Sequence, residues 1–300
     1  MAARWSASAL LLQLLLAAGL AVALAASALS AIAIAGLVLA ELGGFAFLLA
    51  GAPLVLARRK APSSVGRGRM MSRFRALCGD ALALEIALGR MALEPYRAPP
   101  DAAAGVASLR TPVMLVHGFA CSRALWRPLL ARLRAAGIGP VRALSLEPLL
   151  ADIETCAGEL LRQLEGQVAG GSGGCVTIVT HSMGGLVARA ALRRARPGLI
   201  GRIVTIGAPH HGTALACRFP WPSTRQMCPG SSWLRDLNAC QEGLFGIPVT
   251  TLYSLDDNYV VPAGSARLQG ARAIELQGIG HLALLRSQVV LERIVAELLA

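Results

Sequence analysis

Residues 179–185 read VTHSMGG and place Ser182 between a histidine and a methionine, with two glycines close behind. Residues 175–180 (CVTIVT) are a short apolar, β-branched run that predicts a strand, and residues 185–195 (GLVARAALRRA) predict a helix. A serine on a sharp turn from strand to helix is pushed out of the backbone, as in the nucleophile pattern G-x-S-x-G. Thr180 stands where that pattern has its first glycine. The motif alone therefore leaves open whether Ser182 is a nucleophile or an ordinary loop residue.

From residue 111 onward, predicted strands and helices alternate. The predicted strands are 112–116, 141–146, 175–180, 200–207, 248–254 and 272–277, and the predicted helices are 122–136, 151–168, 185–195 and 283–298. Such alternation is typical of an α/β fold with a mostly parallel sheet covered by helices on both faces.

The carboxyl ends of the predicted strands carry residues that can act together, and ligands bind at these ends of a parallel sheet. In chain order they are His117-Gly118-Phe119, His181-Ser182-Met183, Asp256-Asp257 and Gly280-His281. A serine needs a base within hydrogen-bond reach, and the base needs a carboxylate that fixes its tautomer. The order therefore predicts an oxyanion loop, a nucleophile, an acid and a base.

The five histidines can be weighed one by one. His281 follows the last strand in a glycine-flanked loop and is the candidate base, whereas His181 is next to Ser182 on the turn, where its side chain diverges. Structural roles are expected for the other three, which are His117, His210 and His211.

The segment from about 111 to 298 resembles the α/β-hydrolases of the bacterial lipase and esterase kind. The similar blocks are LVHGF, VTHSMGGLVAR, VTIGAPHHGT, YSLDDNYVVP and GIGHLALL, in the order and spacing of that family. The resemblance implies that Ser182 is the nucleophile and His281 the base. It also implies an oxyanion hole formed by the backbone amides of Phe119 and Met183.

The resemblance also bears on the acid and on cofactors. Asp257 is the expected acid because a short apolar stretch follows it, as in the family, and Asp256 is the alternative. The larger lipases of this kind hold calcium through an aspartate beyond the catalytic histidine, but HLALLRS has no acid. No metal or organic cofactor is implied. Thr180 is expected to be tolerated.

Residues 214–246 lie between the strand at 200–207 and the acid. They carry Phe219, Trp221, Met227, Trp233 and Phe245. One reading is a small cap that lines an acyl pocket, with Trp221 and Trp233 as substrate-binding residues. The other is an ordinary excursion whose aromatic side chains pack on the core.

The N-terminal part is strongly apolar. Residues 9–57 contain one ionisable side chain, Glu41, and a single helix of that length would extend about 74 Å, against a hydrocarbon core of roughly 30 Å. Two spans, 9–28 and 31–56, fit better. A turn at 41–44 is an alternative, and so is a signal peptide cleaved near Ala26-Ser27-Ala28, which would still leave an apolar anchor.

Basic residues follow this block and predict its orientation. They are Arg58, Arg59, Lys60, Arg67, Arg69, Arg73 and Arg75, and they account for much of the net charge of +12. Such a cluster marks the cytoplasmic side, so we expect a bacterial inner-membrane protein with a cytoplasmic C-terminal domain and contacts to anionic membrane lipids. Nucleic-acid binding is not favoured, because aromatic residues make up only 4%.

The expected organisation is therefore a membrane anchor with two transmembrane helices at 1–60, a basic linker with an amphipathic helix at 61–110, and the α/β domain at 111–300. The amphipathic helix is predicted over 72–93. In a cytoplasmic domain the seven cysteines should be free thiols. If the domain were exported, two of Cys217, Cys228 and Cys240 could form a disulfide.

The function predicted at this point is that of a membrane-anchored serine hydrolase. It would cleave a carboxylic ester, in a lipid-like or other small-molecule substrate, through an acyl-enzyme intermediate. An acyltransferase using the same triad is an alternative, because an alcohol can resolve the acyl-enzyme in place of water. A non-catalytic hydrolase-like membrane protein is the alternative from another class.

Overall fold

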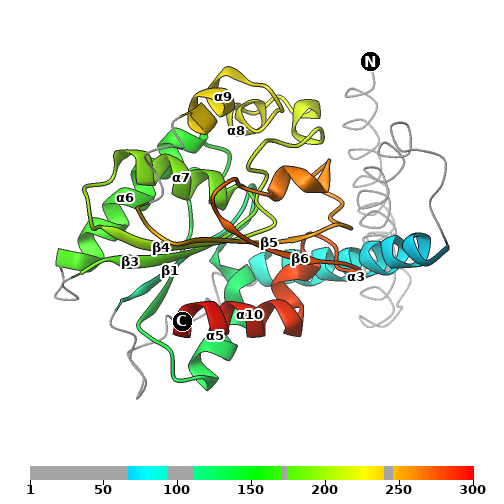
Figure 1. Ribbon diagram of the computed structural model, residues 1–300, viewed down its shortest axis with the longest axis horizontal. Helices are drawn as coiled ribbons and strands as arrows, with labels where there is room; N and C mark the ends of the chain where they lie inside the picture. Colours follow the sequence, from blue (N-terminus) through cyan, green and yellow to red (C-terminus); the bar gives the residue numbers. More distant parts are fainter. Residues whose placement is uncertain (1–66, 93–110, 170–173, 240–245) are drawn as a thin grey trace, which may run out of the picture.

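The structure is a computed structural model, and it describes residues 67–92, 111–169, 174–239 and 246–300 (Figure 1). The predicted transmembrane helices, the alternative signal peptide and most of the basic linker lie outside these ranges. Within them, no helix combines the length and the apolar character needed to cross a membrane. The division of the chain at 60 and 110 stays a prediction.

The described part is built on a parallel sheet of six strands in the order β2-β1-β3-β4-β5-β6. The strands are β1 (Val113–Val116), β2 (Val141–Leu144), β3 (Val176–His181), β4 (Ile200–Ile206), β5 (Val249–Ser254) and β6 (Arg272–Leu276). All six predicted strands are confirmed. β1, β3 and β5 are buried along their whole length, whereas the edge strand β6 is largely exposed.

Helices cover both faces of the sheet (Figure 1). α6 (Ile153–Ala169) and α7 (Gly184–Arg194) pack on one face, and α5 (Arg127–Ala135) and α10 (Gln288–Leu299) pack on the other. Short 3-10 turns precede the last two, η2 (Arg123–Trp126) before α5 and η6 (Ala283–Arg286) before α10.

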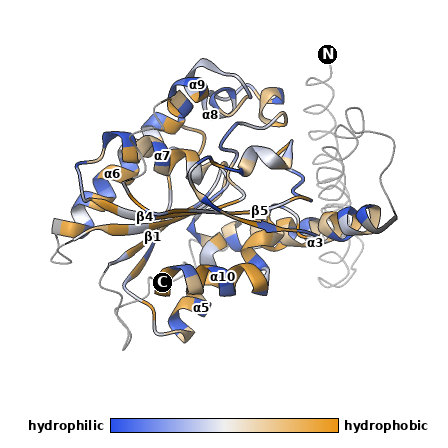
Figure 2. Ribbon diagram, in the orientation of Figure 1, coloured by the Kyte–Doolittle hydropathy of each residue, from blue (hydrophilic) through white to orange (hydrophobic). Residues whose placement is uncertain are grey.

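Alternation along the strands divides the core into two layers. Met114 and Val116 of β1 join the cluster under α6 and α7, whereas Val113 and Leu115 join the cluster under α5 and α10. Hydrophobic and hydrophilic residues alternate along the covering helices, as expected for helices with one buried side (Figure 2).

The helix predicted over 72–93 is present as α3 (Arg67–Ala92) and packs against η2 and η6. Its buried residues are Ala76, Leu77, Asp80, Ala83 and Ala87. Several large apolar side chains on its other sides stay exposed, namely Met70, Met71, Phe74, Leu82 and Leu88. One side of α3 thus packs against the α/β domain, and the other sides are exposed.

The segment predicted as a cap forms three short elements. They are η3 (Ala216–Arg218), α8 (Pro222–Gln226) and α9 (Ser232–Ala239), and residues 240–245 lie outside the described ranges. Met227, Leu234 and Leu237 are buried in the cluster under α6 and α7, so part of the segment packs on the core.

The expectation of free thiols is wrong for two cysteines. Cys217 and Cys228 form a disulfide, with their Cα atoms 5.0 Å apart. The turn from η3 into α8 brings them together, and Cys240 lies outside the described residues. Cys78, Cys121, Cys156 and Cys175 are free.

Candidate active site

Ser182 lies on a sharp turn between β3 and α7. Its φ of 55° falls in the left-handed region, which a serine rarely occupies, and its amide donates to the carbonyl oxygen of Ile206 at 2.9 Å. The strain marks the position at which a strand passes directly into a helix and presents the side chain above the sheet. The structure therefore places Ser182 on the turn that the sequence predicted.

Glycines permit the close approaches around this turn. A Cβ on Gly184 would lie 2.6 Å from the carbonyl oxygen of Val116, and a Cβ on Gly185 would lie 2.4 Å from the Cβ of Ala208. Thr180 is fully buried, and its hydroxyl oxygen would be 3.4 Å from the same Gly185 Cβ. The missing first glycine is therefore accommodated because the opposing position in α7 is itself a glycine.

The loop after β1 borders the serine. A Cβ on Gly118 would lie 2.7 Å from the Cβ of Ser182, so the two backbones approach closely. Among the hydrogen bonds that the described residues form, none uses the backbone amide of Phe119 or of Met183. Met183 caps the N-terminus of α7, where the helix dipole favours negative charge. Both predicted oxyanion amides thus belong to the two segments that meet at Ser182.

His117 keeps this loop in place. Its Nδ1 donates to the carbonyl oxygen of Gly118 at 2.8 Å, and its Nε2 accepts from the amide of Leu146 at 2.9 Å. Because both ring nitrogens bind backbone groups, the expected structural role is confirmed.

His281 and Asp257 form a buried pair. Nδ1 of His281 lies 2.7 Å from Oδ2 of Asp257. The other carboxylate oxygen of Asp257 accepts from the amides of Tyr259 and Val260, each at 2.8 Å. A Cβ on Gly207, at the end of β4, would lie 3.2 Å from both members of the pair. The carboxylate is thus fixed by its own loop and lies against Nδ1 of the imidazole, which leaves Nε2 for the role of base that the sequence predicts.

The neighbouring Asp256 has different partners. Its Oδ2 accepts from the hydroxyl of Ser72 at 2.5 Å and from the amide of Gly278 at 2.8 Å. These contacts tie the start of α3 to the loop after β6. Of the two aspartates, the structure therefore brings only Asp257 to His281.

The surroundings of His281 set its charge. Burial by itself would lower the pKa of His281, but the charge and hydrogen bond of Asp257, together with the charge of Asp80, outweigh burial and raise it. The ring stacks on Tyr259, with centroids 5.1 Å apart, and lies 4.6 Å from the ring of His181. Burial and the charge of His281 lower the pKa of His181 well below its ordinary value, so His181 stays neutral.

Asp80 was missed in the sequence, although it lies beside the His281 loop. It is 1% exposed, and its Oδ1 accepts from the amide of Ala283 at 2.8 Å. Burial is the main reason that its pKa rises to about 6. Asp80 and Ala283 are 203 residues apart in the chain, so no local sequence pattern predicts their contact.

The two predicted substrate-binding tryptophans lie in different places. The ring of Trp221 is 5.5 Å from the ring of Phe119 and stacks on Phe219, which puts it beside the loop after β1 that is predicted to form the oxyanion hole. The indole N–H of Trp233 donates instead to Glu154 of α6 at 2.9 Å. Only Trp221 is therefore brought next to another predicted site residue, and both binding roles stay predictions.

Arg189 of α7 was also missed, and it contacts the end of the segment that the sequence predicts as a cap. It is 3% exposed and donates to the carbonyl oxygens of His210 and Leu237 and, at 2.8 Å, to the side chain of Asn238. Burial lowers its pKa to about 10, so it stays charged at neutral pH. His210 contacts Thr205 at 3.1 Å, and burial keeps its pKa low and the ring neutral. Arg189 thus connects α7, the loop after β4 and α9.

Comparison with known proteins identifies a similar domain and similar solved structures. A family model described as a PGAP1-like alpha/beta domain matches residues 156–220. No curated protein sequence matches the chain.

Solved structures of lipases share the architecture. The mature form of lipase BlEst2 from Bacillus licheniformis is 18% identical, with a TM-score of 0.55 that covers 67% of this chain and 94% of that one. Its propeptide form is 17% identical (TM-score 0.59, 66% of this chain), and lipase B of Aspergillus fumigatus is 21% identical (TM-score 0.53, 70% of this chain). The match spans only 52% of the propeptide form and 62% of the fungal lipase. Together with the strand order and the matched domain, these similarities show that the chain adopts the α/β-hydrolase fold.

Proposed function

We propose that this protein is a serine hydrolase that cleaves carboxylic esters through an acyl-enzyme intermediate. The observation that carries the proposal is the buried His281–Asp257 pair, whose side-chain atoms lie 2.7 Å apart. The pair and the strained Ser182 turn both follow carboxyl ends of strands in the same parallel sheet. Ser182 attacks the ester carbonyl while Nε2 of His281 takes its proton, and His281 then returns that proton to the leaving alcohol. Water, activated by the same histidine, releases the acid.

The oxyanion of the tetrahedral intermediate would lie between the amides of Phe119 and Met183. One such donor contributes about 3–4 kcal/mol to transition-state stabilisation in comparable sites. Trp221 and Phe219, stacked beside this loop, present an apolar surface suited to an acyl chain. The lipase structures that share the fold support a lipid or ester substrate.

A membrane location is part of the proposal, because residues 9–57 are nearly uncharged and basic residues follow them. Two features of the chain predict opposite sides of the membrane for the catalytic domain. The basic cluster predicts the cytoplasmic face, whereas the Cys217–Cys228 disulfide is typical of an oxidising compartment.

Labelling with a fluorophosphonate probe tests the catalytic role. The full chain in mild detergent should be labelled, and Ser182→Ala should abolish both labelling and the hydrolysis of p-nitrophenyl butyrate. Ser287→Ala is a matched control, since its hydroxyl makes no capping bond to α10. Equal labelling of Ser182→Ala and the wild type would refute the proposal. Adding an alcohol to the assay distinguishes a hydrolase, which yields mainly free acid, from an acyltransferase, which yields mainly new ester.

A further inference from the structure

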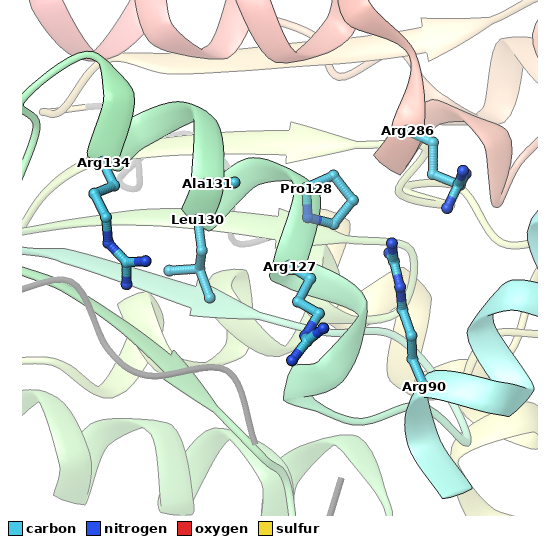
Figure 3. A pocket seen from close by; sticks show the side chains of 7 residues that line it. All are labelled: Arg90, Arg127, Pro128, Leu130, Ala131, Arg134 and Arg286. Carbon is cyan, nitrogen blue, oxygen red and sulfur yellow. The ribbon is translucent and has the colours of Figure 1, made fainter. Parts of the chain in front are cut away.

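A cavity of about 460 Å³ lies between α3, α5 and η6, on the sheet face that α5 and α10 cover (Figure 3). Four arginines dominate its lining. The lining residues are Arg90, Arg127, Pro128, Leu130, Ala131, Arg134 and Arg286. None of the catalytic candidates is among them, so the cavity is separate from the site described above.

The arginines come from three elements. Arg127 and Arg134 lie seven residues apart on α5, with Leu130 and Ala131 between them, so all four project from one side of that helix. Arg90 comes from the last turn of α3, and Arg286 ends η6. Figure 3 shows the side chains of Arg90 and Arg286 extending toward the same space. The packing of α3 on η6 therefore brings positive charges together.

Three of these charges, on Arg90, Arg134 and Arg286, have no acidic partner among the residues that the structure describes. Among the same residues, no acidic side chain lines the cavity. Burial, with the charges of Arg286 and Arg127, lowers the pKa of Arg90. By contrast, Arg132 of the same α5 faces Glu292 of α10 at 3.7 Å. An arginine of α5 that does not line the cavity thus has an acidic partner, whereas Arg90, Arg134 and Arg286 have none within the described ranges.

We propose that this cavity binds a phosphate-bearing anion. A guanidinium presents its N–H groups in a planar fork that matches phosphate oxygens, and several forks around one space suit a multiply charged group. The walls formed by Pro128, Leu130 and Ala131 are apolar, and the volume exceeds that of a bare phosphate. The ligand is therefore a phosphomonoester or a phospholipid headgroup with its glycerol. This inference does not depend on the proposed hydrolase activity.

Binding can be measured by titration calorimetry on the full chain in an uncharged maltoside detergent at low ionic strength. The probes are 1,2-di-O-hexyl-glycero-3-phosphate, its phosphocholine counterpart and inorganic phosphate. The ether linkages prevent hydrolysis. The double variant Arg90→Gln/Arg286→Gln should bind 1,2-di-O-hexyl-glycero-3-phosphate about tenfold more weakly or worse. Arg162→Gln/Arg235→Gln removes two exposed arginines elsewhere and should bind like the wild type.

Arg90→Lys/Arg286→Lys keeps the positive charge but removes the planar guanidinium groups, so its affinity should lie between those of the wild type and the Gln double variant. Melting curves confirm that each variant is folded. Tighter binding of the ether lipid than of phosphate identifies a headgroup as the ligand, whereas equal affinities identify a free phosphate compound. Unchanged affinity in the folded Gln double variant, or no saturable binding of 1,2-di-O-hexyl-glycero-3-phosphate and of inorganic phosphate, would overturn the proposal.

Discussion

The carboxylate of Asp80 accepts a hydrogen bond at 2.8 Å from the backbone amide of Ala283, 203 residues later in the chain. Ala283 is two residues beyond His281, so a helix that precedes the whole sheet holds the loop of the candidate base. The contact is close, since a Cβ on Gly280 would lie 2.5 Å from Cγ of Asp80. We infer that Asp80 is a positioning residue for His281 and also adds negative charge near it.

Asp80→Asn should shift the acid limb of the kcat/KM profile to lower pH. The amide oxygen can still accept from Ala283, but the negative charge that helps to raise the pKa of His281 is lost. A lower pKa keeps the histidine neutral, and therefore active as a base, at lower pH. The measurement is the pH dependence of p-nitrophenyl butyrate hydrolysis by wild type and variant.

Asp80→Ala separates charge from positioning. It removes the hydrogen bond as well, so kcat should fall by about tenfold or more in addition to the pH shift, because small displacements of a catalytic group are costly. If the acid limb of Asp80→Asn coincides with that of the wild type, the charge of Asp80 does not reach His281 and this account is wrong.

The same Asn variant also reports on stability. The folded-state pKa of Asp80, about 6, lies above its ordinary value of 3.8, so the native state binds the proton more tightly than the unfolded chain does. The stabilisation that this proton provides is complete below pH 3.8 and is lost as the pH rises toward 6. Asp80→Asn should therefore gain stability relative to the wild type between these pH values, which urea unfolding at pH 4 and pH 7 can measure. A constant difference would contradict the burial assignment.

The two adjacent aspartates should respond differently to the same substitution. Asp257→Asn should lower kcat by on the order of 10⁴-fold, because an amide in place of the carboxylate favours the wrong tautomer of His281. Asp256→Asn retains an acceptor for Ser72 and Gly278, and its kcat should change by less than about tenfold. Comparable losses in both variants would show that the hydrogen bond from His281 does not identify the acid.

The sequence predicted those parts of the site that local patterns encode. A β-branched run, a turn and a helix locate Ser182, and a chain-order argument locates Asp257 and His281 at other strand ends. Asp80 has no such signal, because in the sequence it is simply an acid in a helical stretch. Its role arises only when the fold packs it against the His281 loop, 203 residues away at Ala283. Arg189 has no local signal either, because only the fold buries it and brings it to the loop after β4 and to α9.

Arg189→Met should destabilise the protein by about 2–4 kcal/mol. The substitution keeps much of the side-chain length but leaves the buried carbonyl oxygens of His210 and Leu237 and the side chain of Asn238 without their donor. Urea unfolding followed by tryptophan fluorescence measures the change. Arg193→Met, on the same helix, breaks a partly exposed pair with Glu154 and should cost no more than about 1 kcal/mol. Similar values for the two variants would refute the bridging role.

The Cys217–Cys228 disulfide predicts the outcome of a thiol count. If it forms in cells, two of the seven cysteines resist alkylation in the denatured, unreduced protein and become reactive after reduction. We expect this result, and with it a catalytic domain in an oxidising compartment, against the prediction from the basic cluster. Cys217→Ser should expose one additional thiol, at Cys228, before reduction. Seven reactive thiols in the unreduced wild type would instead restore the cytoplasmic assignment.

The backbone at Ser182 makes a prediction that is independent of substrate. A non-glycine residue at φ 55° costs about 1–2 kcal/mol, so Ser182→Gly should relieve strain that Ser182→Ala retains. Both variants lack the hydroxyl and should be inactive. Thermal unfolding in the same detergent should place the Gly variant about 2–4 °C above the Ala variant. Glycine normally destabilises, so Ala296→Gly on the exposed side of α10 should lower the melting temperature by a similar amount. If glycine at 182 is as unfavourable as glycine at 296, the turn is not strained, and the argument that places the nucleophile on it loses its backbone evidence.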